Sequence, residues 1–483
     1  MKRAIIILLV ALTTTVTAQQ AVLSKGNESK YVDPYNLSNG TYVGDYQGLD
    51  CWLFSGKKHL KQLVMTDHNL MTLNVVDLPR SNNAEILAAT NRGNHVAALV
   101  ADRSGKRQTA VLSYRLDLDS LSVLAVDTID TFSYSRKDSC LLWAATSPNK
   151  QYNAFIAIVQ YMEKKQYRTL ITLFDAEMHP LWNKEFALGS MHDMKVTDEG
   201  TIVTLGEERD GEESHFIFNI IKQNSANSYD VVVKCDPVKE TRLLGVIGSH
   251  VLAAGLFTPI EQAHPERYTG GLYALSFDMD SVLLTGFLMR PFQNEDLNIL
   301  YNQKTKKVQR EQIADRVRLL DAVTTSYGAV VAVGRSYRTN IVEANGVVNS
   351  TFSAMGIHCV AIDSLGQLRW VRNIRRNDKQ KQDDDLLRLS LLNHNGDVAI
   401  VKSEAPKYPA IYDIAKDAPL LNMGSKNTLV IYSVNGDGEV SKLAVENKSK
   451  HSFLRAFFRP DGTLMLLTAR GNKTRLAQLK FTE

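Results

Sequence analysis

Residues that could carry acid–base or metal chemistry are few and scattered in this sequence. His192 and Asp193 are adjacent and could form an acid/base pair, and Asp383-Asp384-Asp385 could bind calcium. Adjacent strand residues point to opposite faces of a sheet, so the first pair is more simply a structural histidine beside an acid. A run of aspartates usually marks a solvated loop. We therefore expect no catalytic residue, no metal site and no cofactor.

The four cysteines lie far apart, at positions 51, 140, 235 and 359, and in no CxxC or histidine-rich cluster. Cysteines of an exported protein can form disulfides. Cys51 and Cys359, however, stand within apolar runs, where free cysteine behaves as a small buried hydrophobe. We expect four unpaired thiols. The chain also lacks the Gly-x-Ser-x-Gly elbow of a propeller-fused peptidase and the glycine-rich loops that hold nucleotides.

Composition and charge are those of an ordinary globular protein. The chain has 483 residues, 44% hydrophobic and 22% charged, with 56 Lys and Arg against 52 Asp and Glu. These values exclude disorder, collagen and a coiled coil. A pI near 8.6 is too mild for a nucleic-acid-binding protein, which needs concentrated basic surface.

The N-terminus has the pattern of a secretory signal. Lys2-Arg3 precedes an apolar stretch from Ala4 to Val16, and small residues up to Ala18 form a cleavage site. The apolar stretch is too short to span a bilayer comfortably, and no second long apolar run follows. We expect residues 1–18 to be removed and the protein to be exported to the periplasm or the cell surface of a bacterium.

From about residue 42 to the end the sequence predicts strand after strand, in runs rich in Val, Ile, Leu, Phe and Thr. Two kinds of turn alternate between these runs. One ends in glycine or asparagine, as in Thr197–Gly200. The other is rich in aspartate, as in Asp117–Ser120, Asp278–Ser281 and Asp363–Gly366. The alternation predicts a repeated unit of four antiparallel strands.

These repeats predict an all-β fold, a β-propeller in which radial closure removes sheet edges. Seven repeats begin near residues 85, 141, 191, 242, 317, 386 and 453, so we expect about seven blades. The N-terminal strands within Cys51–Val76 either complete the last blade or form an eighth; closure by the two chain ends is the favoured alternative. A pair of β-sandwiches is the main rival. The expected organisation is a signal peptide at 1–18, an extension at 19–41 and one propeller at 42–483, with a helical insertion near 293–316.

Two turn motifs are similar to those of known propellers. Ser147-Pro-Asn-Lys and Arg459-Pro-Asp-Gly resemble the Ser-Pro-Asp-Gly-Lys turns of TolB-like propellers. Asp363-Ser-Leu-Gly-Gln-Leu-Arg-Trp370 resembles the Asp-x-x-Gly-x-x-x-Trp turn of quinoprotein-like propellers. The resemblance covers about a tenth of the chain and implies the architecture. A quinone site would repeat the turn tryptophan in nearly every blade, and only Trp182 and Trp370 occupy that place.

The long insertions in the sequence lie at positions that would all open on one face of a propeller. Three long segments, 257–271, 335–355 and 402–427, are expected loops between second and third strands. Two more, 293–318 and 372–388, are expected crossovers between blades four to six of the seven. Such loops and crossovers open on the same face, which usually marks the binding face of a repeat protein. The five segments hold 19 Lys and Arg against 14 Asp and Glu, a net formal charge of +5.

We therefore expect an exported, non-catalytic propeller that binds a protein, peptide or glycan partner, and an anionic partner is one of the alternatives. We expect a monomer that does not bind nucleic acid and does not span a membrane. A ring of arginines and His192 at the inner-strand starts would favour an anionic group, although pairing with acids of neighbouring blades is the alternative. The other function to consider is a hydrolase or lyase of anionic polysaccharides at the channel mouth. Candidate binding residues are Tyr268, Arg338, Arg375, Arg376, Tyr408, Arg242, Arg318, Arg388 and Arg455.

Overall fold

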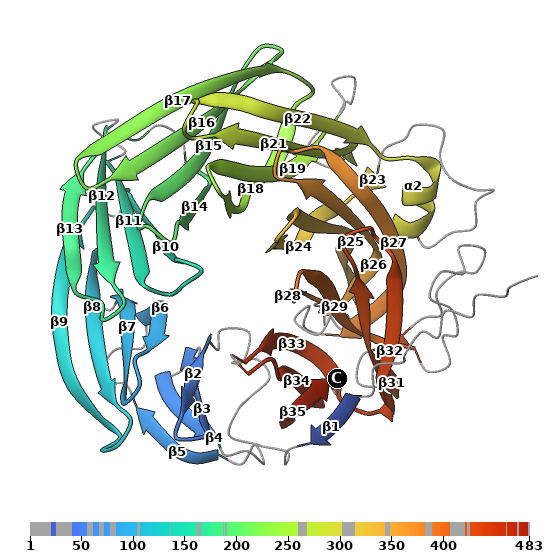
Figure 1. The fold of residues 1–483 in the computed structure, drawn as a ribbon, viewed down its shortest axis with the longest axis horizontal. Coiled ribbons are helices and arrows are strands. Elements are labelled where there is room, and N and C mark those ends of the chain that lie inside the picture. The colour runs from blue at the N-terminus through green and yellow to red at the C-terminus, as the bar shows by residue number, and fades with distance from the viewer. Residues whose placement is uncertain are drawn as a thin grey trace, which may run out of the picture.

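The protein is a ring of β-sheets around a central opening (Figure 1). The computed structural model describes residues 21–25, 41–55, 61–66, 72–77, 84–103, 107–135, 137–161, 166–186, 188, 191–258, 268–301, 314–342, 348–381, 389–405, 421–422, 426–459, 461–470 and 473–481. Eight sheets contain four consecutive antiparallel blade strands each, so the chain is an eight-bladed β-propeller. The predicted all-β propeller is confirmed, with eight blades where about seven were expected.

Blades one to four follow one another in sequence, each running from an inner strand to an outer strand (Figure 1). Their strands are β2 (Thr41–Tyr46), β3 (Leu49–Ser55), β4 (Lys61–Thr66) and β5 (Thr72–Asp77); β6 (Ala84–Asn91), β7 (His95–Asp102), β8 (Gln108–Asp117) and β9 (Ser122–Ser133); β10 (Ser139–Thr146), β11 (Tyr152–Tyr161), β12 (Gln166–Asp175) and β13 (Pro180–Glu185); and β14 (Asp193–Val196), β15 (Ile202–Asp210), β16 (Glu213–Lys222) and β17 (Ser225–Lys234).

Blades five to eight contain the remaining long strands. They are β18 (Val238–Ile247), β19 (His250–Phe257), β21 (Gly271–Asp278) and β22 (Leu283–Pro291); β24 (Val317–Thr325), β25 (Gly328–Val342), β26 (Val348–Asp363) and β27 (Leu368–Lys381); β28 (Ser390–His394), β29 (Asp397–Glu404), β31 (Asn427–Val434) and β32 (Val440–Ser449); and β33 (Ser452–Phe458), β34 (Leu464–Arg470), β35 (Lys473–Phe481) and β1 (Ala21–Lys25).

Ring closure by the two chain ends is confirmed, but not through the N-terminal strands that we favoured. The strands within Cys51–Val76 do not complete the last blade; with β2 they form a blade of their own. The last blade is completed by β1, whose residues Ala21–Lys25 pair antiparallel with β35 in the segment that we assigned to an extension. A strand pattern reveals a strand but not its partner, which explains the error.

The aspartate-rich turns between third and fourth strands are held by their own side chains. Asp117 Oδ1 accepts the N–H groups of Asp119 at 2.7 Å and Ser120 at 3.0 Å. The corresponding Asp175, Asp278, Asp363 and Asn435 accept backbone N–H groups within their own turns in the same way. These side chains replace missing backbone partners, which is why Asp and Asn recur at this position.

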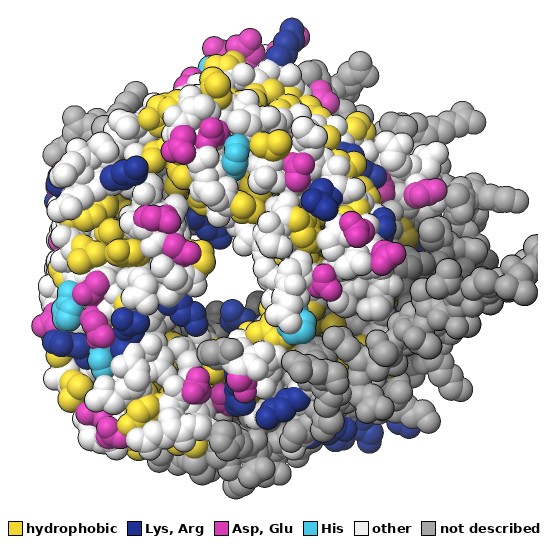
Figure 2. Space-filling model, in the orientation of Figure 1, with side chains coloured by type: hydrophobic (Ala, Val, Ile, Leu, Met, Phe, Trp, Pro, Cys, Tyr) yellow, Lys and Arg dark blue, Asp and Glu magenta, His cyan; other side chains and the backbone are white. Residues whose placement is uncertain are grey.

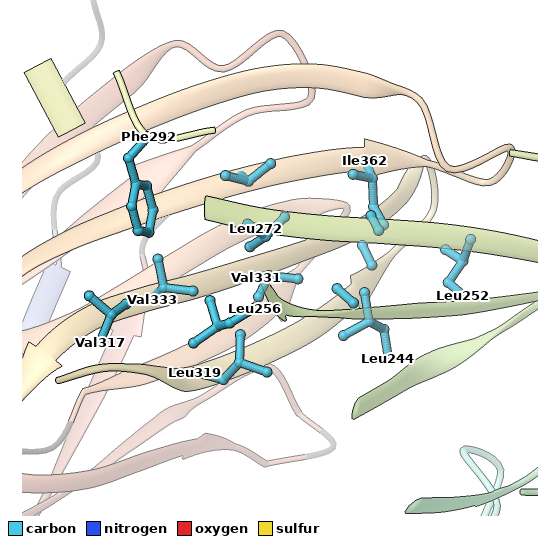
Figure 3. Packing of buried hydrophobic residues seen from close by; sticks show 14 of the residues in the cluster. Leu244, Leu252, Leu256, Leu272, Phe292, Val317, Leu319, Val331, Val333 and Ile362 are labelled. Carbon is cyan, nitrogen blue, oxygen red and sulfur yellow. The ribbon is translucent and has the colours of Figure 1, made fainter. Parts of the chain in front are cut away.

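The hydrophobic core is divided into layers between neighbouring blades. The described residues form eight buried clusters, one for each seam between blades. The seam between blades five and six holds 16 buried residues, among them Leu252, Leu272 and Val331, and Figure 3 shows most of them. The seam that closes the ring, between blades eight and one, holds only three: Trp52, Leu454 and Leu467.

Blades five to seven carry additional elements outside the regular pattern. Helix α2 (Asn294–Leu300) precedes β24, and β20 (Tyr268–Thr269) pairs with β23 (Ala314–Asp315). Strand β30 (Leu421–Asn422) adds to blade six, parallel to β27 at Asp378 and Lys379. The helical insertion predicted near 293–316 is too long, because α2 ends at Leu300 and Ala314 already belongs to β23. The expected loop at 335–355 is mainly a hairpin, since β25 and β26 extend to Val342 and from Val348.

Candidate functional site

The additional elements gather on one face of blades five to seven. Second-to-third loops and blade crossovers open on this face, which we call the insertion face; the tight first-to-second and third-to-fourth turns form the opposite turn face. The pairs β20–β23 and β27–β30 join insertions from neighbouring blades, and α2 packs on β26 and β27. In the eight-blade numbering, the fourth to sixth blades of our sequence analysis are blades five to seven.

Helix α2 is fixed by a buried carboxylate, Asp296, which is 1% exposed. Its Oδ2 accepts the Gln293 backbone N–H at 2.8 Å and lies 2.8 Å from Arg290 Nη1 of β22. Its Oδ1 accepts from Asn373 Nδ2 of β27 at 2.9 Å and lies 3.2 Å from Nδ1 of His358 in β26. Burial alone would raise the pKa of Asp296, but the hydrogen bonds from His358, Arg290 and Asn373 outweigh it and hold that pKa well below its usual range.

The contacts of His358 indicate which of its ring nitrogens donates a hydrogen bond and which accepts one. Nδ1 faces two acceptors, Asn373 Oδ1 at 2.6 Å and Asp296 Oδ1, so Nδ1 carries a hydrogen. Nε2 lies 3.1 Å from the donor Arg290 Nη1 and therefore accepts. His358 is fully buried, and it ties α2 to blades five and six. The cluster is structural.

A close backbone approach also fixes α2. Gly356 of β26 has a φ of +59°, and a Cβ placed on it would lie 2.4 Å from the carbonyl oxygen of Ile299. Only glycine suits both the left-handed backbone and the contact. The helix therefore meets blade six at a defined depth, which positions its last residues and Tyr301.

An arginine–tyrosine stack connects the residue after α2 to blade six. The guanidinium carbon of Arg335, in β25, lies 4.6 Å from the ring centroids of both Tyr301 and Tyr337. That of Arg316, just before β24, lies 5.3 Å from the Tyr337 ring. We call these four residues the arginine–tyrosine stack. Such contacts orient guanidinium groups at modest energy, about 0.5–1 kcal/mol each when exposed.

Three predicted arginines lie at the start of inner strands and are exposed: Arg242 in β18, Arg318 in β24 and Arg455 in β33. Figure 2 shows basic side chains on the wall of the central opening. Two carboxylates share this region. The charges of Arg242 and Arg318 act on Glu240, and those of Arg242 and Arg455 act on Asp321. Around the channel mouth, Arg242 acts on both acids, whereas Arg318 acts on Glu240 and Arg455 on Asp321, although the three arginines come from three blades.

Both carboxylates at the mouth bond the next blade. Asp321 Oδ2 accepts the N–H of Leu391 in β28 at 2.8 Å, and Glu240 accepts that of Leu319 in β24. Burial raises the pKa of both carboxyls, in part against these hydrogen bonds and the arginines. Asp193 accepts the N–H of Leu243 at 2.9 Å in the same manner. These acids join inner strands of neighbouring blades, in line with the inter-blade alternative stated above.

His192 and Asp193 do not form an acid/base dyad. The Asp193 carboxylate bonds Leu243 and Met194, and His192 Nε2 lies 3.3 Å from the carbonyl oxygen of Glu207. His192 is exposed at the start of the fourth blade. Its role is therefore not that of a base activated by its neighbouring acid.

Two of the candidate binding residues are not exposed as expected. Arg375 and Arg376 are 5% and 2% exposed, because β27 continues as a strand and β30 pairs alongside it. Arg376 forms a buried ion pair with Asp378, and the Arg375 carbonyl oxygen accepts from Lys402 Nζ at 3.3 Å. Neither arginine can bind a partner without rearrangement of blade six.

Of the remaining candidate binding residues, only some have side chains in the described part of the chain. Arg338 is exposed, with its guanidinium carbon 5.4 Å from the Phe352 ring centroid. Tyr268 lies in β20, opposite Asp315, and its side chain is outside the described part of the chain. Tyr408 and Arg388 also lie outside the described residues. The arginine–tyrosine stack was not predicted from the sequence, in which the run Arg335-Ser-Tyr-Arg338 was its available signal.

A second buried cluster lies within blade seven. Glu404 Oε1 is 3.2 Å from Lys402 Nζ, its Oε2 is 2.5 Å from Lys442 Nζ, and the Tyr432 hydroxyl donates to Oε1. Burial would raise the pKa of Glu404, but the two ammonium groups and the hydroxyl outweigh it and lower that pKa. The cluster joins β29, β31 and β32 within blade seven.

All four cysteines are free and buried, as predicted. Within the described ranges, no group of three or more His, Cys, Asp and Glu is arranged to hold a metal ion. No helix in the same part of the chain is long and apolar enough to cross a membrane.

Comparison with known proteins finds propellers among similar solved structures. No family model and no curated protein matches the sequence. The WD40 domain of SCAP from fission yeast aligns over 92% of this chain and 95% of its own, with 9% identity and a TM-score of 0.37. A polysaccharide lyase aligns over 82% and 90%, with 11% identity and a TM-score of 0.38. The propeller domain of the trilobed protease from Pyrococcus furiosus aligns over 73% and 97%, with 10% identity and a TM-score of 0.31. At these values none of them indicates an activity or a partner for this chain.

Proposed function

We propose that the protein is an exported, non-catalytic propeller that binds an acidic partner through the insertion face of blades five to seven. The observation that carries this proposal is the arginine–tyrosine stack, which holds two guanidinium groups against Tyr337 beside the mouth arginines. Arginine presents a rigid fork of N–H donors to carboxylates and phosphates while its face rests on an aromatic ring. Arg338, Arg242, Arg318 and Arg455 extend the basic surface.

The test is a glycan and peptide array probed with the wild-type protein and with two matched variants. Arg335→Gln removes a stacked guanidinium from the insertion face. Arg369→Gln removes one from the turn face, where the Arg369 guanidinium carbon lies 4.9 Å from the Tyr327 ring centroid. We expect that Arg335→Gln no longer binds the array ligands and that Arg369→Gln still binds them. Equal behaviour of the two variants would refute the proposal.

Export is part of the proposal and rests on residues 1–18. A periplasmic or cell-surface location follows from the basic region, apolar stretch and small-residue site. Intact mass of the protein purified from its native compartment should correspond to a chain beginning at Gln19. A chain that retains Met1–Ala18 would contradict export.

A second candidate is a hydrolase or lyase acting on an anionic polysaccharide. The observation in its favour is that Glu240 and Asp321, two carboxyls with raised pKa, lie among arginines at the channel mouth. Their bonds to Leu319 and Leu391 argue for a role in joining blades. Incubation with polygalacturonate should give no new reducing ends and no unsaturated uronate absorbance. Turnover that is lost in Glu240→Gln would favour the enzyme.

A further inference from the structure

The outer edge of blade four differs from the outer edges of the other blades. Strand β17 pairs with β16 over ten consecutive residues, from Ser225 to Lys234, without a bulge. The ladders of the outer strands of blades one, two, three, five, six and seven each contain at least one register shift. The outer strand of blade eight, β1, is regular but has only five residues. Among the described strands, β17 therefore forms the longest regular outer edge of the ring (Figure 1).

This edge lacks features that usually prevent a sheet from pairing with another chain. Bulges, prolines and covering segments protect the edge strands of natural proteins. Pro180 and Pro291 lie in the outer strands of blades three and five, and β30 pairs with part of β27. β17 contains no proline, and within the described ranges no strand pairs with its outer side. Its outward N–H and C=O groups can therefore accept a further strand.

The side chains of β17 alternate between the core and the solvent. Val231 and Val233 pack against the buried cluster between blades four and five. Asp230, Val232 and Lys234 are exposed, and Val232 has an exposed fraction of 48%. The exposed side thus presents an apolar residue with a carboxylate on one side and an ammonium group on the other. This pattern is complementary to a copy of itself that runs in the opposite direction.

The two charged residues also have contacts within their own chain. His215 Nδ1 lies 2.9 Å from Asp230 Oδ2, and Lys234 Nζ lies 2.8 Å from Glu212 Oε2. The side chains of Lys234 and Glu212 are 74% and 68% exposed. Exposed ion pairs contribute little free energy, so these contacts do not prevent Asp230 and Lys234 from pairing with another chain.

The geometry of antiparallel strands limits how two copies of β17 can pair. Facing residues direct their N–H and C=O groups either both toward each other or both away, and these directions alternate along a strand. In a symmetric pair, one residue must therefore face its own copy at the two-fold axis. With Val232 at the axis, Asp230 faces the partner's Lys234, and the same pair recurs on the other side. With Asp230 at the axis, two carboxylates would face each other, which is unfavourable.

From this arrangement we infer that β17 pairs antiparallel with β17 of a second copy of the chain, with Val232 at the two-fold axis. The surface is isologous, because the same residues contribute from both copies. The inference goes beyond the proposed function and differs from the monomer expected from the sequence. A contact between two strand edges is smaller than a standard interface, so we expect a reversible dimer that depends on concentration.

The pairing also defines how the two rings are oriented. β17 begins after a third-to-fourth turn on the turn face and ends at the crossover on the insertion face. Antiparallel pairing reverses this direction in the second copy. The two insertion faces therefore point to opposite sides of the dimer.

Sedimentation of the intact protein at increasing concentration tests the inference. We expect the mean mass of the wild type to rise from that of a monomer toward that of a dimer. Val232→Lys places two ammonium groups at the axis and should abolish the rise. The matched control is Val126→Lys in β9, the outer strand of blade two, where Val126 is 38% exposed and the ladder is bulged. This control should dimerise like the wild type.

A charge exchange tests the register. Asp230→Lys alone sets two lysines against each other, and Lys234→Asp alone sets two aspartates against each other. Each variant should dimerise about tenfold more weakly or less, because the two-fold axis repeats every charge pair. An equimolar mixture of the two variants restores opposite charges at both places and should dimerise again. Recovery in the mixture also shows that both variants are folded.

Oxidation of Val232→Cys provides a second readout, since this position should form a disulfide with its own copy. The inference is overturned if the wild type stays monomeric at every concentration, or if Val232→Lys still dimerises. It is also overturned if the mixture of charge variants stays monomeric, or if Val232→Cys is cross-linked to another protein in place of its copy. Binding of array ligands to the insertion face is measured separately, so either proposal can fail without the other.

Discussion

At the scale of single residues, the fold depends on a few buried charges that are satisfied from several blades at once. Asp296 is the clearest example, because partners from a loop and three strands meet at this one helix carboxylate. A buried ion pair adds little when compared with apolar packing, but removing one member leaves an uncompensated charge. The role of such residues is to specify one position for α2.

Asp296→Asn should therefore destabilise the protein by about 3–5 kcal/mol, the usual cost of breaking a buried pair. The pKa of this carboxyl is lowered on folding, so its stabilisation is present above the unfolded pKa near 4 and is lost as the pH falls toward the folded value. Denaturant unfolding of both proteins between neutral pH and about pH 3 measures this. The difference should shrink in acid; a constant difference would contradict the account.

The cysteines give a second prediction at this scale. Burial raises the pKa of Cys359 to about 12, and burial together with Asp50 raises that of Cys51 to about 12. The thiolate is the reactive form, so a thiol reagent should label the native protein slowly. After denaturation without reductant it should detect all four free cysteines. Finding fewer would mean that disulfides form.

At the scale of elements, the turns were predictable from the sequence and the strand partners were not. An aspartate turn is determined by contacts within four residues, so Asp117 and Asp363 could be recognised directly. Pairing of β1 with β35 joins residues about 450 positions apart, and nothing in Ala21–Lys25 encodes that partner. Segment 335–355 was predicted as a loop because it contains polar residues, although it is mainly the extended hairpin of β25 and β26.

The candidate site shows the same limit. Inner-strand arginines could be predicted because strand starts are local features. The burial of Arg375 and Arg376 depends on Lys402 and β30, which come from the next blade. The stack could not be predicted because Tyr301 reaches Arg335 only through the tertiary position of α2.

Gly356 tests whether the position of α2 matters for binding. Gly356→Ala places a methyl group against the Ile299 carbonyl oxygen at a φ of +59°, whereas Gly248→Ala has nearly the same φ, +60°, and nothing within 4 Å. Both variants carry backbone strain of about 1 kcal/mol. Only Gly356→Ala should also shift α2 and reduce affinity for the array ligands. Equal affinity of the two variants would show that the helix does not support the surface.

At the scale of the whole molecule, the seam that closes the ring between blades eight and one is held in part by polar and aromatic contacts. Among the described side chains, its buried cluster has three hydrophobic residues, against 16 between blades five and six. An ion pair and an aromatic contact strengthen this seam. Arg459 Nε donates to Asp50 Oδ1 at 2.7 Å, and the Tyr42 and Phe457 rings stack with their centroids 4.6 Å apart. Opening should begin where apolar burial is least.

Arg459→Met should accelerate amide hydrogen exchange in blades eight and one while blades five and six remain protected. Removing Arg459 leaves Asp50 buried without its charged partner at the closing seam, and local opening then costs less free energy. Mass spectrometry of exchanged peptides reports each blade separately. Uniform acceleration around the ring would show that the blades unfold as one unit.

The central claim is that partners bind the insertion face of blades five to seven. The most direct measurement is photo-cross-linking of an array-selected ligand, followed by peptide mass mapping of the adducts on the intact protein. We predict adducts in α2, at the start of β24 and in the half of β25 that contains Arg335 and Tyr337. Adducts confined to the turn face, for example near Arg369 and Tyr327, would contradict the account.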